Sequence, residues 1–358
     1  MTGATGIQAP DPRAEALGPT THATLPGLPP AWNKRSLARA KLDAVLRQGK
    51  AWAASSRLSI ATLGRAPSVA ALNIQPDIFE GSADEANALF QGRYRFAGET
   101  LLSPNQTPWT LIGANPDWHE ALHDFHWLRH FTAAGGEASQ RQARALLDGW
   151  LKRFSRFDAT WWRPDLAGRR ITAWVGHLPL LLEGADLPLR EGFLEALARQ
   201  VRYIGRAYGA MEPGKGRIEA LMGVILGHLA LGQWGRPLAR DLRRLDQALA
   251  QQILPDGGHA SRNPADHLTV LEALVRIRTA LANAGQVPGV ELVRAIDRLT
   301  PAVRFFRLGD GRLATFHSAT PGRPRGSSMC WRWRRPRARR PRACPTSVSS
   351  VSRPGAWP

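Results

Sequence analysis

The stretch GRIEALMGVILGHLALGQWGRPLARDLRRLDQALAQQI, residues 216–253, contains the structural unit from which the fold is predicted. Its apolar residues recur at helical spacing over 216–232 and again over 236–253. Only a short turn that ends at Gly235 separates the two segments. Because helices of this length joined by a short turn pack against each other, the stretch predicts one antiparallel helical hairpin.

The same pattern extends in both directions along the chain. Helical segments alternate with short turns rich in Gly or Pro from Pro116 onward, whereas 73–108 carries short, Gly-punctuated runs typical of irregular strands. No motif recurs at a fixed period, which favours a closed ring of hairpins over an open solenoid. The other predicted helices are 34–57, 118–134, 138–156, 169–183, 188–209, 265–284 and 289–306.

Composition is typical of a soluble globular protein. Of the 358 residues 43% are hydrophobic, enough for a sizeable core, and two Cys are too few for a disulfide scaffold. The longest apolar run, 218–231, is interrupted by Glu219 and His228, so we expect no membrane span. Residues 1–30 lack the charged start and apolar run of a secretory signal, which predicts a cytoplasmic location.

The formal charge of +19 is unevenly distributed. Ten arginines and no acidic residue lie in 323–358, which leaves +9 for the first 322 residues. This tail has two interpretations: a basic arm that binds nucleic acid, or the product of a wrong reading frame. We favour the second, because Arg outnumbers Lys 43 to 5 and GC-rich DNA read out of frame yields such residues. The remaining charge agrees with an acidic polysaccharide and does not argue for nucleic acid.

Four histidines, His119, His123, His126 and His130, follow one another at spacings of four, three and four residues. On one continuous helix they share a face. A metal site is one interpretation, but no Cys and no compact carboxylate cluster accompanies them, and we expect no metal. We favour histidines that are hydrogen-bonded inside a hairpin, with His123 and Trp127 as candidates to face a cleft.

Two further segments are dense in side chains suited to ligand binding. Tryptophan and arginine gather in 161–177, and Trp faces stack on sugar rings while Arg forks pair with carboxylate or sulfate. The alternative for this segment is ordinary core Trp beside a solvated Arg pair. The polar loop 254–267 contains more His and Arg than a turn requires, which favours a functional interpretation.

The chain resembles the heparinase II/III family in the order and spacing of four pieces. These are NPDWHEALHDFHWL at 115–128, RRITAW at 169–174, the loop 254–267, and RFFRLGDGRLA at 304–314. The resemblance covers about residues 75 to 320. It implies an α/α toroid followed by a β-sandwich, with polysaccharide lyase chemistry in the cleft between them.

Such a lyase removes the C5 proton of a uronic acid whose carboxylate has been neutralised, and it requires no metal or organic cofactor. The resemblance implies proton transfer by His259 and His267. From residue chemistry we add a candidate substrate-binding set that consists of Trp118, His123, Trp127, Arg170, Trp174, Arg217 and Arg262.

Two positions depart from the family pattern. Asp266 stands where a Tyr is expected just before the second His, and Arg217-Ile218-Glu219 replaces a usual Asn-His pair. The family pattern also ends near Gly322, where the sandwich is expected to begin. These departures predict a toroid that is inactive as a lyase.

The predicted fold class is mainly α, an incomplete α/α toroid with only the start of a β-sandwich. We divide the chain into a disordered segment 1–33, a toroid 34–306, the start of a sandwich 307–322, and a disordered Arg/Pro-rich tail 323–358. The predicted function is a heparinase II/III-like lyase that cleaves an acidic, uronate-containing glycan by β-elimination, inactive in this truncated form. The alternative is a noncatalytic helical protein that binds a glycan or another polyanion.

Overall fold

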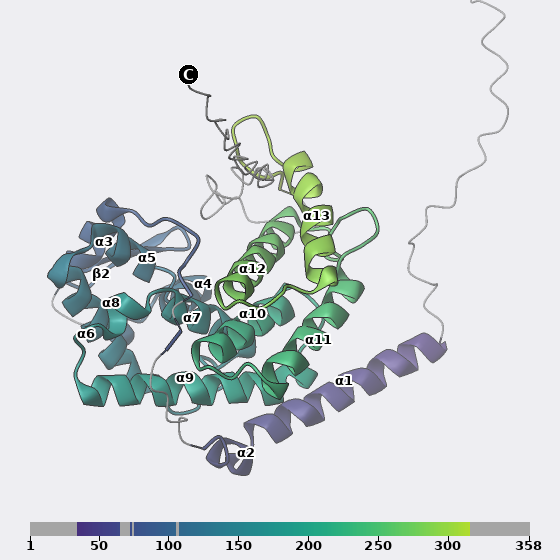
Figure 1. Cartoon of the computed structure of the whole chain (residues 1–358), viewed down its shortest axis with the longest axis horizontal. Helices are drawn as coiled ribbons and strands as arrows, with labels where there is room; N and C mark the ends of the chain where they lie inside the picture. The colour runs from purple at the N-terminus through teal and green to yellow at the C-terminus, as the bar shows by residue number, and fades with distance from the viewer. Residues whose placement is uncertain (1–33, 65–71, 74, 105–106, 316–358) are drawn as a thin grey trace, which may run out of the picture. The chain divides into compact units, whose positions relative to one another are not determined.

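The computed structural model describes residues 34–64, 72–73, 75–104 and 107–315 (Figure 1). The predicted N-terminal segment and the Arg-rich tail lie outside these ranges. The chain divides into two compact units, Met1–Leu46 and Arg47–Pro358. In the first unit the described residues form the beginning of helix α1 (Lys34–Ser55). Nowhere in the described ranges is a helix long and apolar enough to cross a membrane.

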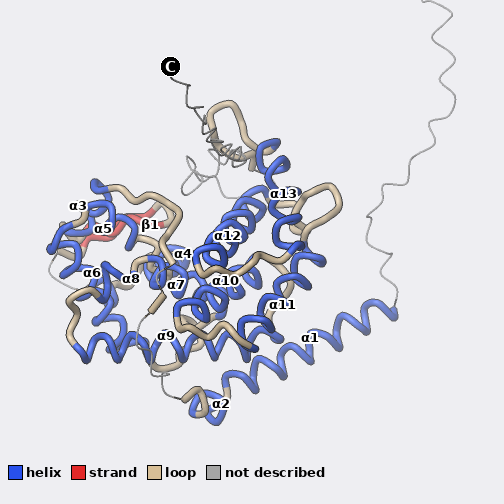
Figure 2. Tube along the Cα trace, viewed as in Figure 1, coloured by secondary structure: helices blue, strands red, loops and turns tan. Residues whose placement is uncertain are grey.

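The second unit is mainly helical and has one small sheet, which confirms the predicted fold class of a helical toroid (Figure 2). Short 3₁₀ turns occur at Pro108–Thr110 and Tyr208–Ala210. The helices that follow α1 are α2 (Arg57–Ala61), α3 (Ala83–Phe90), α4 (Pro116–His123), α5 (Leu128–Ala134), α6 (Gly136–Phe154), α7 (Pro164–Gly176), α8 (Leu178–Leu182), α9 (Leu187–Ala207), α10 (Lys215–Ala230), α11 (Arg236–Gln252), α12 (Pro264–Asn283) and α13 (Val290–Phe305).

Helix α10 is the central helix of this unit. Every residue from Ile218 to Ala230 is buried, and the helix packs against α7, α9, α11 and α12 (Figure 1). A helix that is apolar on all sides needs neighbours on all sides. The apolar run that resembles a membrane span is therefore the core helix of the toroid.

Two glycines set the crossing of α7 and α10. A Cβ atom on Gly168 would lie 2.4 Å from the Glu219 carbonyl oxygen, and one on Gly223 would lie 2.4 Å from the Gly168 Cα. Only glycine allows two backbones to approach this closely. Because Arg169 directly follows Gly168, the crossing also places Arg169 beside Glu219.

The sheet consists of two antiparallel strands, β1 (Arg93–Phe96) and β2 (Glu99–Leu102), where short strands were predicted. Ala97 and Gly98 join them with φ angles of 48° and 82°, as a tight two-residue hairpin requires. At the end of the described residues, an antiparallel bridge joins Arg307 to Leu313 across the predicted Gly-Asp-Gly turn. The β-sandwich after this turn remains a prediction.

Two predicted helices are interrupted in the structure. The predicted helix 118–134 is wrong as a single element, because Phe125 adopts a φ of 59° and separates α4 from α5. The predicted helix 169–183 begins earlier, at Pro164, whose fixed φ suits a first helical turn. It breaks at His177, where α7 ends and α8 begins.

Candidate functional site

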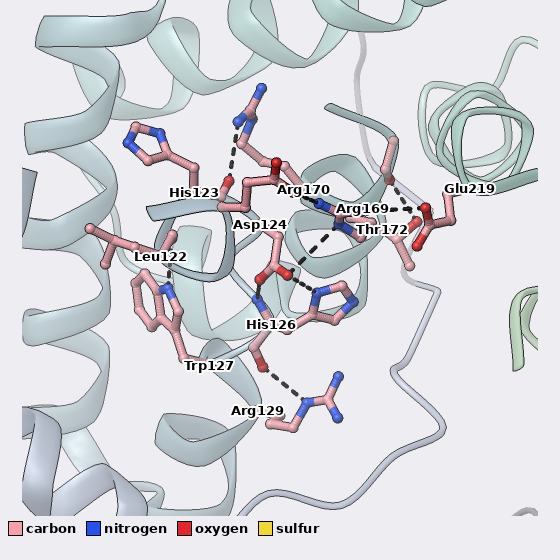
Figure 3. A network of polar contacts seen from close by, with 12 residues as sticks. Leu122, His123, Asp124, His126, Trp127, Arg129, Arg169, Arg170, Thr172 and Glu219 are labelled. Atoms are coloured by element: carbon pink, nitrogen blue, oxygen red, sulfur yellow. Dashed lines mark hydrogen bonds and ion pairs between the residues drawn. The ribbon is translucent and has the colours of Figure 1, made fainter. Parts of the chain in front are cut away.

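Polar side chains gather in a network at the break between α4 and α5 (Figure 3), and Asp124, His126 and Arg129 of this region line a cleft. In this turn the Asp124 carboxylate accepts a hydrogen bond from the His126 backbone N–H at 2.9 Å. Trp127 Nε1 donates to the Leu122 carbonyl oxygen at 2.9 Å, and Arg129 Nε donates to the His126 carbonyl oxygen at 2.9 Å. Because three hydrogen bonds fix the turn, Asp124 and His126 are held in place rather than free to rotate.

Arg169 is the centre of the charge network at this turn. Its guanidinium donates to Glu120 at 3.0 Å and to Glu219 at 3.3 Å. Asp124 and Asp165 each lie 3.9 Å from it. Burial lowers the pKa of Arg169, but these four carboxylates outweigh burial and raise it.

Glu219 is the carboxylate of this network that comes from the central helix. Its side chain is 7% exposed. Burial raises the pKa of Glu219, although Arg169 and Lys215 act to lower it. The charge of Glu219 therefore depends on the nearby guanidinium of Arg169.

A second ion network surrounds Asp77, which lies in the loop before α3. Arg276 approaches its carboxylate to 3.3 Å, Arg129 to 3.4 Å and His177 to 3.6 Å. Burial raises the pKa of Asp77, but Arg276 and the other partners lower it well below its usual range. The Phe79 ring packs under both guanidinium groups, 4.2 Å from Arg276 and 5.6 Å from Arg129.

Arginines of both networks line a cleft of about 670 Å³ between α4, α7, α10, α12 and the β1–β2 turn. An adjoining cavity of about 360 Å³ shares Asp124, His126 and Arg129 with it. Five carboxylates and three guanidinium groups line the larger cleft. They are Asp117, Glu120, Asp124, Glu219 and Glu272, with Arg129, Arg169 and Arg276.

His126 is the imidazole that lines both cavities. Its Nδ1 lies 3.0 Å from the Asp124 carboxylate. Burial lowers the pKa of His126 to about 4, and Asp124 offsets only part of this effect. A neutral imidazole oriented by a carboxylate is an arrangement that can accept a proton.

The two histidines predicted to transfer protons, His259 and His267, lie elsewhere and are buried. His259 Nδ1 lies 2.9 Å from Ser261 Oγ and its Nε2 lies 3.1 Å from Gln252 Oε1. His267 Nε2 lies 3.2 Å from the Leu299 carbonyl oxygen. Burial lowers the pKa of both imidazoles, that of His267 to about 4. Both therefore have structural hydrogen-bond partners outside the cleft.

Arg170 and His123 are also core residues. Arg170 is fully buried between Trp rings, 4.5 Å from the Trp150 centroid, and donates to Gln200 and to the carbonyl oxygens of His123 and Trp161. Burial lowers its pKa to about 9. His123 stacks on Trp161 at 3.8 Å, and burial together with Arg170 lowers its pKa to about 2.

The interpretation of three tryptophans as sugar-stacking platforms needs correction. Trp118 and Trp174 are 0% exposed and Trp127 is 3% exposed, so protein atoms cover their ring faces. Trp174 packs edge-on against Trp150 at 5.2 Å, and the Trp118 indole N–H donates to the Tyr94 carbonyl oxygen at 3.2 Å. These rings contribute to the core rather than to a ligand surface.

Arg217 and Arg262 lie apart from the cleft. Arg217 donates to the Met211 carbonyl oxygen and lies 5.2 Å from the Tyr208 ring centroid. Arg262 pairs with Asp256 at 2.6 Å. In the described part of the chain, none of the nine predicted site residues lines the cleft or its adjoining cavity.

The residues that do line the cleft left a weak signal in the sequence. Charged residues inside otherwise apolar helices, such as Glu219 in α10 and Arg276 in α12, are costly to bury unless they are paired. Such residues mark positions that require a partner of opposite charge. The sequence of one helix does not show which residue of another element is that partner. Over the described residues, no group of three or more His, Cys, Asp or Glu is placed to hold a metal ion.

Comparisons with known proteins identify solved structures of similar fold and a curated protein that matches part of the chain. No protein-family profile matches the chain. FtsZ-localized protein C of Caulobacter vibrioides (strain NA1000 / CB15N) is 36% identical over 226 residues, which cover 62% of this chain and 38% of that protein. The chain thus matches well under half the length of this relative.

Solved structures of heparinase III-type lyases are similar in backbone. The heparinase III product of gene BT4657, with methylated lysines, has a TM-score of 0.50 at 13% identity and covers 78% of this chain and 48% of its own. Heparan sulfate lyase HepC from Pedobacter heparinus has a TM-score of 0.50 at 15% identity, over 79% of this chain and 47% of its own. The described chain has the helical fold of these lyases. The chain spans about half the length of either enzyme.

Proposed function

We propose that the chain is a noncatalytic, glycan-binding protein built on a polysaccharide lyase fold. The volume of the cleft is within the range of ligand sites. Its wall presents carboxylates and guanidinium groups held by their neighbours, and fixed donors and acceptors suit the hydroxyl groups of a sugar. For this cleft we therefore propose the noncatalytic alternative to the predicted inactive lyase.

The observation that carries this proposal is the composition of the cleft wall. β-Elimination needs a cation to neutralise the substrate carboxylate and an acid/base side chain to remove the C5 proton and protonate the leaving oxygen. Each cleft arginine already faces carboxylates: Arg169 has four, and Arg129 and Arg276 share Asp77.

Tyrosine, a residue that can return the proton, has no place in this wall. The chain contains three, Tyr94, Tyr203 and Tyr208, and none lines the cleft as described. Tyr94 lies in the core, where burial raises its pKa to about 12. Among the described residues, His126 is thus the imidazole in this wall, and no tyrosine accompanies it there.

A lyase assay on the full chain tests the proposal. Incubation with heparan sulfate and alginate is expected to give no increase in absorbance from a C4–C5 double bond. Titration calorimetry with oligosaccharides is expected to show a binding component at the cleft that Arg169→Met abolishes. Arg294→Met, at an exposed ion pair on α13, serves as the control and leaves binding unchanged. Accumulation of unsaturated product that His126→Gln removes would overturn the proposal.

The identity to FtsZ-localized protein C favours a second candidate function, localisation with FtsZ. This candidate is independent of glycan binding, since it rests on a relative and not on the cleft. A fluorescent fusion of the chain should coincide with labelled FtsZ, and the purified chain should sediment with FtsZ polymers. A diffuse fusion together with no cosedimentation would reject it. A cytoplasmic location and the four-part division of the chain remain predictions.

A further inference from the structure

A second cavity, of about 630 Å³, lies between α9, α11 and the turn that joins α10 to α11. Its lining includes Arg202 and Arg206 from α9, Arg240 from α11, and Trp234 from the turn. Its lining and that of the cleft have no residue in common among those described. We call it the basic pocket.

The charges of the basic pocket differ from those of the cleft. Three arginines line it, and no carboxylate does so within the described residues, whereas five carboxylates line the cleft. Sites with different charge distributions select different ligands. An anionic group meets an attractive field in the basic pocket and a mixed field in the cleft.

Two of these arginines are held in place without losing their charge. Arg202 donates to the Leu63 carbonyl oxygen at 2.5 Å, and Arg206 donates to the Thr62 carbonyl oxygen at 2.9 Å. Carbonyl oxygens fix a guanidinium but carry no net charge to neutralise it. Arg206 Nη1 also donates to Ser59 and to the Thr62 hydroxyl, so its Nε and the second N–H of its Nη2 remain for a ligand, while Arg202 donates through Nη1.

The third arginine, Arg240, belongs to a cluster around Asp241. The buried Asp241 carboxylate lies 3.0 Å from Arg240, 2.9 Å from Arg244 and 3.2 Å from His228. One carboxylate thus faces two guanidinium groups, so the cluster retains a positive charge. The His228 imidazole also contacts Gln233 at 2.9 Å, which ties the cluster to the turn before Trp234.

Trp234 gives the basic pocket a fixed aromatic surface. It is 41% exposed, and its indole N–H donates to the Leu229 carbonyl oxygen at 3.1 Å. This hydrogen bond holds one edge of the ring and leaves part of the ring open. A rigid, half-exposed indole is a surface on which a sugar ring can stack.

We propose that the basic pocket binds an acidic saccharide. Its pyranose ring stacks on Trp234, while its carboxylate or sulfate accepts hydrogen bonds from Arg202 and Arg206. The combination favours a saccharide, because an acidic peptide needs the cations but not a flat, fixed ring. This site does not rest on the function proposed for the cleft, and it places the ligand predicted from the chain's positive charge outside the cleft.

The test titrates the full chain with a size-defined heparan sulfate oligosaccharide, monitored by calorimetry. Trp234→Ala is expected to weaken binding about tenfold, the effect of one lost stacking contact. Arg206→Gln is expected to weaken binding and to reduce its dependence on salt. Trp52→Ala and Arg153→Gln remove an exposed Trp and an exposed Arg elsewhere, and should leave affinity within about twofold. Trp234→Phe keeps a ring and should restore most of the affinity.

Three outcomes would overturn the proposal. The first is no binding of the oligosaccharide by the wild-type chain. The second is binding that Trp234→Ala leaves unchanged and that a polyglutamate peptide matches, which would indicate an acidic peptide site. The third is that the cleft variant Arg169→Met loses all oligosaccharide binding, while Trp234→Ala binds as the wild-type chain does. If the Trp234-dependent binding is retained in Arg169→Met, the basic pocket is a separate site from the cleft. This conclusion holds whether or not the cleft itself binds a glycan.

Discussion

Arg169 and Glu219 form a pair whose members stabilise each other inside the protein. Their closest approach is 3.3 Å, with the Arg169 side chain 17% exposed and that of Glu219 7% exposed. Removing one partner leaves the other as an uncompensated buried charge. Arg169→Met is expected to lower the free energy of unfolding by about 3 kcal/mol, measured by urea denaturation.

The matched control for this prediction is the double variant Arg169→Met with Glu219→Gln. It removes both charges and should recover part of the lost stability. Equal losses in the single and the double variant would show that the pair is not coupled.

Histidines with lowered pKa values predict how stability depends on pH. His126, His130 and His267 each have a folded pKa of about 4, because burial disfavours the charged form. In the unfolded chain a histidine titrates near its ordinary pKa of 6.5. Between these values the unfolded state binds more protons, so stability decreases as pH falls from about 6.5 to 4.

The contribution of one imidazole to this slope can be measured. His130 Nδ1 accepts a hydrogen bond from the Ser82 N–H at 3.1 Å, and His130→Asn keeps an acceptor there. Urea denaturation at pH 7 and pH 5 should show a smaller loss of stability in this variant than in the wild type. An identical loss would mean that His130 is not held neutral.

At the scale of elements, the crossing of α7 and α10 depends on the absence of side chains. Gly168→Ala puts a Cβ 2.4 Å from a backbone oxygen, so the helices must move apart. We expect a loss of about 1–3 kcal/mol, measured by thermal unfolding, together with weaker binding because Arg169 moves from Glu219.

A glycine in a helix without close neighbours should behave in the opposite way. Nothing lies within 4 Å of a Cβ at Gly49 in α1, and Ala favours helix over Gly by about 0.5–1 kcal/mol. Gly49→Ala is therefore expected to be neutral or stabilising. If Gly168→Ala were equally harmless, close packing would not be what sets the crossing.

The helices themselves were largely predictable, because an apolar stripe at helical spacing is a local property of the sequence. Two details were not. Phe125 adopts a positive φ that its residue type disfavours, and the hydrogen bonds of the surrounding turn hold it there. The break before α8 at His177 likewise involves a residue in contact with Asp77, about 100 positions away.

The site was less predictable than the fold, since its residues meet only through tertiary packing. Asp77 and Arg276 are 199 positions apart in the sequence, and nothing local links them. The tryptophans selected for stacking are core residues, whereas the accessible Trp234 stands in a Gly-flanked turn at 232–235. Its position in a short turn between two helices was the feature of the sequence that could have indicated an accessible ring.

At the scale of the whole molecule, charge is divided between two separate sites. The cleft carries paired charges of both signs, and the basic pocket carries arginines without lining carboxylates among the described residues. A net positive charge alone does not say where an anion binds. The two sites differ in whether carboxylates line them beside the guanidinium groups, and this difference decides where an anion is attracted.

The most direct test of the central claim, that the cleft binds a glycan without cleaving it, is hydrogen–deuterium exchange of the full chain with and without oligosaccharide. The product mixture of the same sample is read by mass spectrometry. We predict slower exchange over α4, α5 and the start of α12, with every oligosaccharide recovered at its original mass. Unsaturated fragments, or exchange in these helices that the oligosaccharides leave unchanged, would contradict the account.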